Sequence, residues 1–392
     1  MKILIVRTIA VENDCSKNNY NSQEIGLATE LSKLGNECGI VYYAKKGNRK
    51  FETIESAGEK IKVYHIEGKN IVWNAIFDKE IYDLCNEYDI IQVAECEQIA
   101  SWLIYTKFPN KTIIYHGPYR SKFTKKYNLR SKVFFSIFLK RKEYWKAPVI
   151  TKSKLAENYL RKVGFVNIKT FGVGLYEHNF ENKELDKSKK KVIDDIVKAK
   201  GDYKYILYLG AISKRKNYKF VIEILNELVN KRNKKYKLVS IGKTAYKEER
   251  YNKECIKLIN KYNLNNYIIH FDSLSQGYLK DIYKNCDVYI LPTQYDIFGM
   301  VYLEAMYFGL PIVTSRCGGS SLLIKNKDNG YVLNLNDKNE WANAIENILD
   351  NNDPINEKIE YNKKLIMENY LWSVIAKKFL KEYQKLGGKS GD

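Results

Sequence analysis

Short runs of β-branched and aromatic residues recur along the chain, and longer stretches of mixed polar and apolar residues separate them. Apolar runs of this length, bounded by polar segments, predict buried strands. In the first half the runs are Lys2–Val6, Cys38–Tyr43, Asp89–Val93, Thr112–His116 and Pro148–Lys152. In the second half they are Tyr205–Gly210, Lys237–Gly242, Tyr267–Phe271, Val288–Pro292 and Pro311–Ser315.

The segments between these runs predict helices. The clearest one lies between Tyr205–Gly210 and Lys237–Gly242, where apolar residues repeat with the helical period of about 3.6. Its apolar face holds Val221, Ile224, Leu225, Leu228 and Val229. Because strands alternate with helices, we expect parallel sheets covered by helices on both faces, with ligands bound beyond the carboxyl ends of the strands.

A charged stretch, Glu181–Asp202, separates the two sets of runs. It is crowded with Lys, Asp and Glu and contains no aromatic residue, which predicts an exposed connection with room for a short helix. A chain of 392 residues has the length of two or three domains of about 150 residues. We therefore expect an α/β protein of two doubly wound domains, 1–180 and 203–370, with a cleft between them.

The composition excludes several classes of protein. Hydrophobic residues make up 45% and aromatic residues 13%, enough for sizeable cores and too much for global disorder. No apolar run approaches the ~18 residues that cross a bilayer, and the N-terminal run ends at Arg7 and predicts a strand, not a signal peptide. The seven cysteines form no close pair, so reduced thiols in a cytoplasmic protein are expected, not zinc ligands or disulfides.

The net charge of +20 favours an anionic partner, although a Lys-rich proteome would also produce it. The charge is densest in Tyr119–Lys146, where ten Lys and Arg residues face one acid, Glu143, and alternate with aromatic residues. This pattern suits an anionic membrane surface or a lipid-linked acceptor and also single-stranded nucleic acid. A solvated face with aromatic side chains turned to the core is the remaining interpretation.

Candidate chemistry concentrates in Leu291–Pro311. A strand ends at Pro292, a loop follows, and an almost wholly apolar helix is expected from about Phe298 to Phe308, ended by Gly309 and Pro311. A helix that is apolar on all sides is buried, so its one carboxylate, Glu304, should have a polar partner. The free amides at Phe298–Met300 would bind an anion.

The second acid of this segment is Asp296, eight positions before Glu304. In a helix that spacing is roughly 12 Å, too long for the carboxylate pair of a glycosidase. The two acids would therefore hold different parts of one elongated ligand. A ligand made of a sugar, a diphosphate and a ribose would fill that arrangement.

The same segment resembles a known family. Pro-Thr-x-x-Asp-x-Phe-Gly from Pro292, continued by Glu-Ala-Met-x-x-Gly-x-Pro-Ile-Val from Glu304, is similar to the E-x7-E region of retaining glycosyltransferases of family 4, of the bacterial type and GT-B fold. Further matching segments are Met1–Val6, Gln23–Ala28, Leu34-Gly35, Tyr115–Gly117, Phe171–Gly174, Leu209-Gly210, Lys214–Asn217, Cys317–Gly319 and Trp372. The resemblance implies an acceptor-binding first domain, a nucleotide-sugar-binding second domain, and a final helix, 371–392, that packs back on the first.

The resemblance also implies roles for single residues. Glu304 would bind the ribose hydroxyls, Asp296 the transferred sugar, and the amides of Phe298, Gly299 and Met300 the sugar and phosphate. Lys216 would neutralise the diphosphate leaving group, and His116 would face the reacting sugar from across the cleft. Without the motif, Asp296 would be read as a helix cap, His116 as a structural residue and Gly318-Gly319 as an ordinary turn.

Some positions depart from the family pattern. The family usually has Glu at Asp296, Arg at Ala211 and often Glu at Leu322, and it has a glycine pair where Asn18–Asn21 stands. Because Ala211 cannot contact phosphate, Lys214 or Arg215 is expected to substitute. The chain contains no Asp-x-Asp pair, which many metal-dependent glycosyltransferases use, so no metal is expected.

The resulting hypothesis is a metal-independent retaining hexosyltransferase without a cofactor. Its donor would be a nucleoside-diphosphate sugar, with UDP favoured, and its acceptor a glycan, lipid-linked or part of a cell-surface polysaccharide. It would be cytoplasmic, held at the inner face of the membrane through 119–146. The alternatives are a GT-B sugar-nucleotide epimerase, a glycogen- or sucrose-type synthase, and a nucleic-acid-binding protein, which would leave Asp296 and Glu304 unexplained.

Overall fold

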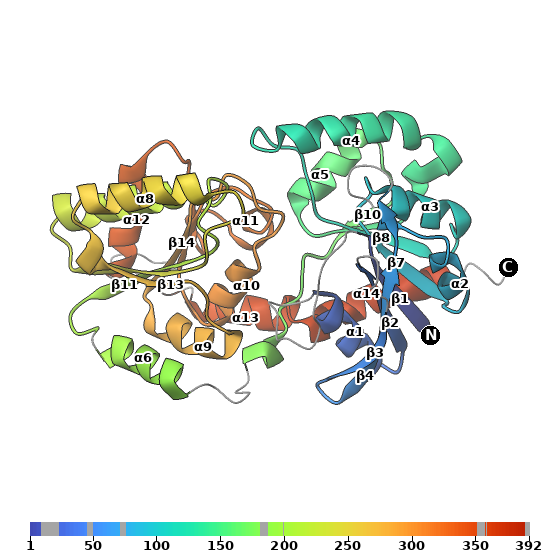
Figure 1. Cartoon of the computed structure of the whole chain (residues 1–392), viewed down its shortest axis with the longest axis horizontal. Coiled ribbons are helices and arrows are strands. Elements are labelled where there is room, and N and C mark those ends of the chain that lie inside the picture. Colours follow the sequence, from blue (N-terminus) through green and yellow to red (C-terminus); the bar gives the residue numbers. More distant parts are fainter. Residues whose placement is uncertain are drawn as a thin grey trace. The chain divides into compact units, whose positions relative to one another are not determined.

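The computed structural model describes residues 1–8, 23–44, 50–70, 76–180, 187–198, 200–350, 357 and 359–388. The chain divides into two compact units, shown in Figure 1. The first unit comprises Met1–Tyr176 and Asn369–Asp392, and the second comprises Glu177–Glu368. The loop Asn18–Asn21 lies outside the described residues.

The first unit is built on an eight-stranded sheet with the strand order β10-β9-β8-β7-β1-β2-β4-β3. All neighbouring strands are parallel except β3, which runs antiparallel to β4. The strands are β1 Lys2–Arg7, β2 Glu37–Ala44, β3 Lys50–Ser56, β4 Glu59–Glu67, β7 Ile90–Ala94, β8 Thr112–His116, β9 Val149–Thr151 and β10 Ile168–Thr170. A separate two-stranded ribbon pairs β5 Lys69–Asn70 with β6 Ile76–Phe77.

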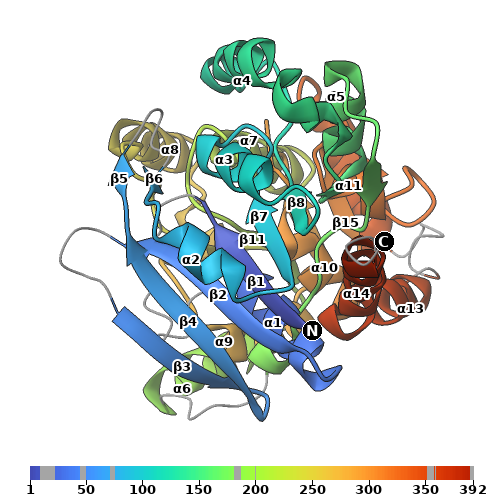
Figure 2. The same cartoon turned by 90° about the vertical axis from the view of Figure 1, so that its right-hand side faces the viewer.

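Helices cover both faces of this sheet. They are α1 Gln23–Lys33, α2 Ile81–Asn86, α3 Ile99–Lys107, α4 Lys125–Phe138, the 3-10 helix η1 Arg141–Lys146, α5 Lys154–Val163 and α14 Trp372–Gly387. In Figures 1 and 2, α2 and α3 lie on the face opposite to α1. The last helix, α14, packs against α1. Its fully buried Trp372 ring occupies the space that a Cβ on Gly26 or Gly174 would need, which explains both glycines by close packing.

The second unit has a six-stranded, wholly parallel sheet with the order β13-β12-β11-β14-β15-β16. Its strands are β11 Lys204–Leu209, β12 Tyr236–Ile241, β13 Ile268–Phe271, β14 Val288–Leu291, β15 Ile312–Thr314 and β16 Tyr331–Val332. Its helices are η2 Glu177–Phe180, α6 Lys187–Lys198, α7 Tyr218–Asn226, η3 Glu227–Lys231, α8 Glu249–Lys261, η4 Asn265–Tyr267, α9 Gln276–Asn285, α10 Met300–Tyr307, α11 Ser320–Leu323, α12 Lys338–Leu349 and α13 Ile359–Asn369.

All ten predicted strands are present, and so is the predicted helix that begins after β11. The five residues of its apolar face are buried, over α7 and the π-helical turn η3. Within the charged stretch, α6 occupies twelve residues and packs against α9. Its Ile193 is buried although Lys and Asp surround it in the sequence.

Candidate active site

The loop between β14 and α10 places Asp296 at the carboxyl end of the second sheet. Helix α10 begins at Met300, two residues later than expected, because Gly299 has a left-handed φ of 82° and cannot belong to the helix. The first helical amides are therefore those of Met300 and Val301, because the Tyr302 amide already donates to the Gly299 carbonyl at 3.0 Å, and the predicted amides at Phe298 and Gly299 precede the helix. The first amides of a helix have few intrahelical acceptors and suit an anion.

Lys216 lies opposite Asp296, in the turn that joins β11 to α7. The turn is closed by the Asn217 amide, which donates to the Ser213 carbonyl at 2.9 Å, and Asn217 itself takes a left-handed φ of 57°. The Lys216 amide donates to Ser213 Oγ at 3.2 Å. The Lys216 Nζ forms an ion pair with Asp296 Oδ2, and the two side chains are only 10% and 15% exposed.

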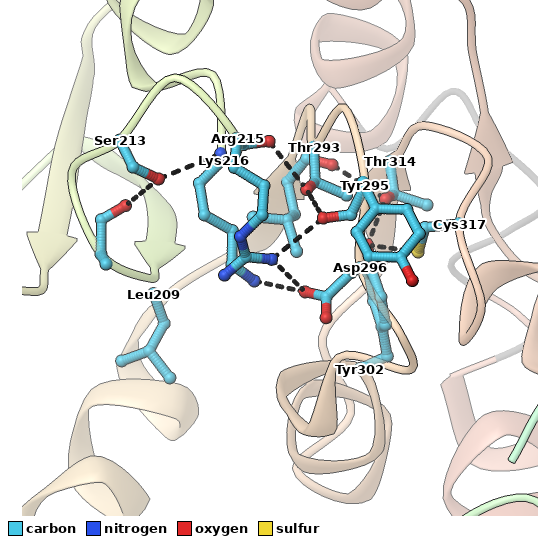
Figure 3. A network of polar contacts seen from close by, with 12 residues as sticks. Leu209, Ser213, Arg215, Lys216, Thr293, Tyr295, Asp296, Tyr302, Thr314 and Cys317 are labelled. Carbon is cyan, nitrogen blue, oxygen red and sulfur yellow. Dashed lines mark hydrogen bonds and ion pairs between the residues drawn. The ribbon is translucent and has the colours of Figure 1, made fainter. Parts of the chain in front are cut away.

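Arg215 belongs to the same site. Its Nη1 donates to the Tyr295 carbonyl at 2.9 Å and lies 3.8 Å from Asp296 Oδ2. Its own carbonyl accepts from Thr293 Oγ1 at 3.1 Å. Figure 3 shows Arg215 and Lys216 approaching Asp296 together. Lys214 and Arg215 are the two residues expected to substitute for an Arg at Ala211. Arg215 faces the Asp296 carboxylate, whereas Lys214 is exposed.

The Gly318-Gly319 pair shapes the Asp296 loop. A Cβ on Gly318 would overlap the Ile297 carbonyl, and a Cβ on Gly319 would overlap the Phe298 carbonyl. The Gly318 amide also donates to the Asp296 carbonyl at 3.0 Å. The pair is therefore more than an ordinary turn, because it lets two loops meet backbone to backbone.

Glu304 lies on α10 and has no exposed surface. The hydroxyl of Tyr283, from α9, donates to its Oε2 at 2.8 Å, which confirms that the buried carboxylate has a polar partner. Tyr283 is itself wholly buried, and its ring stacks on Phe308 with centroids 5.2 Å apart. The phenol therefore holds the carboxylate in one place, a contact that spacing in the sequence does not reveal.

His116 ends β8 in the first unit and is fully buried. The Cys96 amide contacts its Nδ1 at 3.2 Å, and Nδ1 lies 3.1 Å from Glu95 Oε2 and 3.4 Å from Glu97 Oε2. Neither acid was a sequence candidate. Glu95 follows the largely apolar strand β7 directly, and Glu97 comes two residues later. Polar residues at the carboxyl end of such a strand can indicate a site at the sheet edge.

Over the ranges that the structure describes, no three or more His, Cys, Asp or Glu side chains are grouped so that they could hold a metal ion. Within the same ranges, no helix combines the length and the apolar character needed to cross a membrane.

The second half of the chain is similar to known proteins. Residues 189–365 match the family of glycosyl transferases group 1. An uncharacterized glycosyltransferase of Methanocaldococcus jannaschii is 27% identical over 184 residues, which are 47% of this chain and 45% of that protein. The capsular polysaccharide biosynthesis glycosyltransferase CapM of Staphylococcus aureus is 26% identical over 233 residues, 59% of this chain and 57% of that protein.

A probable sucrose-phosphate synthase of Thermosipho melanesiensis is 26% identical over 193 residues, 47% of this chain and 43% of that protein. The chain thus spans about half the length of the curated relatives it matches. Residues 189–365 are thus similar to glycosyl transferases group 1, and glycosyltransferases are among the relatives of this chain.

Solved structures show the fold over nearly the whole chain. A sucrose-phosphate synthase from Thermosynechococcus elongatus superposes with a TM-score of 0.76 at 16% identity, covering 99% of this chain and 100% of that one. Anabaena Alr3699/HepE in complex with UDP-glucose gives 0.71 at 14% identity, covering 98% and 100%. These neighbours confirm the predicted GT-B fold with two Rossmann-like domains.

Proposed function

We propose that this protein is a retaining glycosyltransferase that moves a hexose-type sugar from a nucleoside-diphosphate sugar, of UDP type, to a hydroxyl of a glycan. One observation carries the proposal: Lys216, Asp296 and the start of α10 lie together at the end of a parallel sheet, with Glu304 further along α10. The match of residues 189–365 to glycosyl transferases group 1 supports it.

The residues of this site suit departure of a diphosphate. Transfer breaks the bond between the sugar C1 and the diphosphate oxygen, and a bond forms from C1 to the acceptor oxygen, whose proton passes to the departing diphosphate. Negative charge then grows on the diphosphate, where Lys216, Arg215 and the first amides of α10 would stabilise it. Asp296 would exchange its ion pair with Lys216 for hydroxyls of the sugar.

We assign the acceptor to the first unit and the donor to the second. Glu304 would hold the ribose hydroxyls through charge-assisted hydrogen bonds. His116, at the end of a first-unit strand, would contact the reacting sugar. Because two cations and a helix N-terminus serve the diphosphate, we propose that the reaction needs no divalent metal, and activity should then survive excess chelator.

The test is product formation in the presence of candidate donors and acceptors. Nucleoside diphosphates and their sugars are first ranked by the rise in unfolding temperature, since a ligand of the native state stabilises it by mass action. The best donor is then mixed with glycan acceptors, and the products are identified by mass spectrometry. Transfer to a glycan supports the proposal. Transfer to a sugar phosphate would identify a synthase instead, and conversion of the donor without an acceptor would identify an epimerase.

We further propose that the acceptor is lipid-linked or part of a surface polysaccharide, and that the protein works at the cytoplasmic face of the membrane. The similarity to CapM supports this assignment. Structural support comes from the α4 surface, which consists of Leu129, Val133 and Ile137 with the basic residues around them. These three side chains recur every four positions, so they share one face of α4, and they are 66%, 38% and 42% exposed.

The surroundings of this apolar stripe are basic. Nine of the ten Lys and Arg residues in Tyr119–Lys146 are exposed, and Arg130 is half-buried. Phe134, Phe135 and Tyr144 face the core, so part of the aromatic pattern is structural. In Figures 1 and 2, α4 lies at the outer edge of its unit. An exposed apolar stripe among cations suits an anionic lipid interface.

Vesicle sedimentation tests the α4 surface. The protein should sediment with anionic vesicles at low salt and be released as ionic strength rises, because each Lys or Arg near the surface contributes about 1 kcal/mol. Replacing Lys140, Arg141 and Lys142 by Ser should weaken sedimentation and leave donor binding unchanged. If the protein ignores anionic vesicles at low salt, the acceptor is a soluble glycan, and retention by single-stranded nucleic acid at physiological salt would revive the nucleic-acid alternative.

A further inference from the structure

Three neighbouring strand ends of the first unit meet at a buried charged cluster. Strand β7 is followed by Glu95 and Glu97, β8 ends at His116, and β9 is followed by Lys152. We name these four residues the His116 cluster. The exposed fractions of their side chains are 8% for Glu95, 1% for Glu97, 0% for His116 and 14% for Lys152. Burial of so many ionisable groups is costly unless they neutralise one another.

Glu95 is the best-anchored member of the cluster. It accepts a hydrogen bond from the Gly117 amide at 2.9 Å and lies 3.5 Å from the Lys152 ammonium. Its backbone has a left-handed φ of 62°, which is unfavourable for a residue other than glycine. The local strain is offset by these contacts, and such strain concentrates at functional sites. Because of Lys152 and His116, the pKa of Glu95 falls to about 2 although burial alone would raise it, so Glu95 stays ionised.

The two neighbours of His116 Nδ1 favour different protonation states. The Cys96 amide, at 3.2 Å, favours a lone pair on Nδ1, whereas the ionised Glu95 Oε2, at 3.1 Å, favours a proton. A full charge in a buried site outweighs one amide dipole. Glu97 Oε2 also lies close to Nδ1, at 3.4 Å.

The other groups around the cluster fit this assignment. Burial alone would lower the pKa of His116, but its neighbours Cys96, Glu97 and Glu95 raise it well above the ordinary value. The pKa of Glu97 is raised, because burial and the negative charge of Glu95 outweigh the opposing effects of His116 and Tyr127. Other titratable groups that interact with the cluster are Arg7 of β1, Tyr115 of β8, Tyr144 of η1 and Tyr159 of α5.

The far side of the imidazole has a different character. His116 Nε2 is buried, and no atom of the described residues forms a hydrogen bond with it. A buried polar atom without a partner in the protein needs an explanation, and a ligand is one of the common ones. If Nδ1 and Nε2 both carry protons, the Nε2–H is a charged donor that is available to an oxygen acceptor.

We propose that Glu95 is a positioning residue that keeps His116 as an imidazolium, so that its Nε2–H donates a hydrogen bond to a hydroxyl or phosphoryl oxygen of the bound sugar substrate. His116 then acts as a cationic donor and not as a general base, because it has no lone pair to accept a proton. The identity of the ligand rests on the proposed function. The protonation state does not.

The first experiment measures protonation directly. In full-length protein with 15N-labelled histidine, nitrogen chemical shifts of the imidazole rings are followed from pH 6 to 9. We expect His116 to show two protonated nitrogens at pH 7.5 and a pKa at least one unit lower in Glu95→Gln. The matched control is Glu52→Gln, because Glu52 Oε1 contacts the other buried histidine, His65, at 2.7 Å. It should leave the His116 signals unchanged.

The second experiment measures the pH profile of transfer. Gln at position 95 still accepts the Gly117 amide bond, so the fold should be retained, and kcat should fall at least tenfold at pH 8 and recover at pH 6, where the imidazole regains its proton. A purely structural role would lower kcat equally at both pH values and overturn the proposal. A neutral His116 in the wild-type protein at pH 7.5 overturns it without any variant. A protonated His116 in a protein that transfers no sugar refutes the proposed function and leaves the protonation assignment intact.

Discussion

Replacing Glu304 by Gln is the sharpest test of the donor site. The change keeps the shape of a side chain that has no exposed surface and removes its negative charge. Tyr283 donates to Glu304 Oε2 at 2.8 Å, and its hydroxyl can donate equally well to the amide oxygen of Gln. The variant therefore separates the charge of the group from its packing.

The magnitude follows from the kind of hydrogen bond that is lost. A bond to a charged group contributes about 1.5–3 kcal/mol and a neutral one about 0.5–1.5 kcal/mol. If Glu304 accepts two ribose hydroxyls, the change costs roughly 2 kcal/mol of binding, and a 1.4 kcal/mol loss is already tenfold in Kd. We expect at least a tenfold weaker Kd for the nucleoside-diphosphate sugar. The buried amide adds N–H groups, so unfolding stability should fall by no more than about 1–3 kcal/mol.

The assay is titration calorimetry with the best donor, alongside urea unfolding of each protein. The matched control is Glu346→Gln on α12, where the carboxylate pairs with Lys234 at 2.6 Å and Arg232 at 2.8 Å in the same unit. It should leave Kd unchanged. A ligand reaches the buried Glu304 only if the residues that cover it shift. If Glu304→Gln lowers stability and leaves Kd at the wild-type value, Glu304 is a structural partner of Tyr283, and our assignment is wrong.

Three further predictions concern the ion pair, the glycine pair and pH. Lys216→Ala should lower kcat by roughly 10²-fold, and more than it weakens donor binding, because it removes stabilisation of growing charge; an equal loss in both, by steady-state kinetics and calorimetry, would contradict this role. Gly318→Ala should lower stability by about 1–3 kcal/mol, because its methyl group would overlap the Ile297 carbonyl, whereas Gly387→Ala, with the nearest atom at 3.9 Å, should not; thermal unfolding of both variants checks the contrast. Burial would raise the pKa of Glu157, but hydrogen bonds from Lys154, Thr170 and Arg161 lower it to about 2, so its stabilising contribution is present above pH 4.5 and lost as pH falls toward 2. Urea unfolding between pH 6 and 3 should show a shallower loss in Glu157→Gln, and an unchanged slope would show that Glu157 contributes nothing to the pH dependence.

The central strands of both sheets are predictable because burial on both faces leaves a continuous apolar run in the sequence. The hairpin of β3 and β4 was missed for the opposite reason. β3 is an edge strand with the sequence Lys-Phe-Glu-Thr-Ile-Glu-Ser and no fully buried residue, so its composition resembles a loop. β10 and β16 are too short for a local pattern.

The candidate site was predictable where a local motif defines it. Asp296, Glu304 and Lys216 stand in strand-to-helix segments of recognisable spacing, and the structure joins Lys216 to Asp296. The contacts that set their geometry are tertiary. Tyr283 reaches Glu304 from another helix, and Glu95 reaches His116 from another strand end. No periodicity encodes such a meeting of distant segments.

The absence of an Arg at Ala211 changes how the site is held together. A guanidinium at position 211 would be placed by the end of β11, whereas Arg215 is placed by the Asp296 loop, through the Tyr295 carbonyl at 2.9 Å. A second hydrogen bond, from Thr293 Oγ1 to the Arg215 carbonyl, also joins the Asp296 loop to the turn that holds Arg215. One loop therefore fixes both the carboxylate and the cation. Because Gly318 and Gly319 pack against the backbone of that loop, their lack of side chains helps to set the position of both charges.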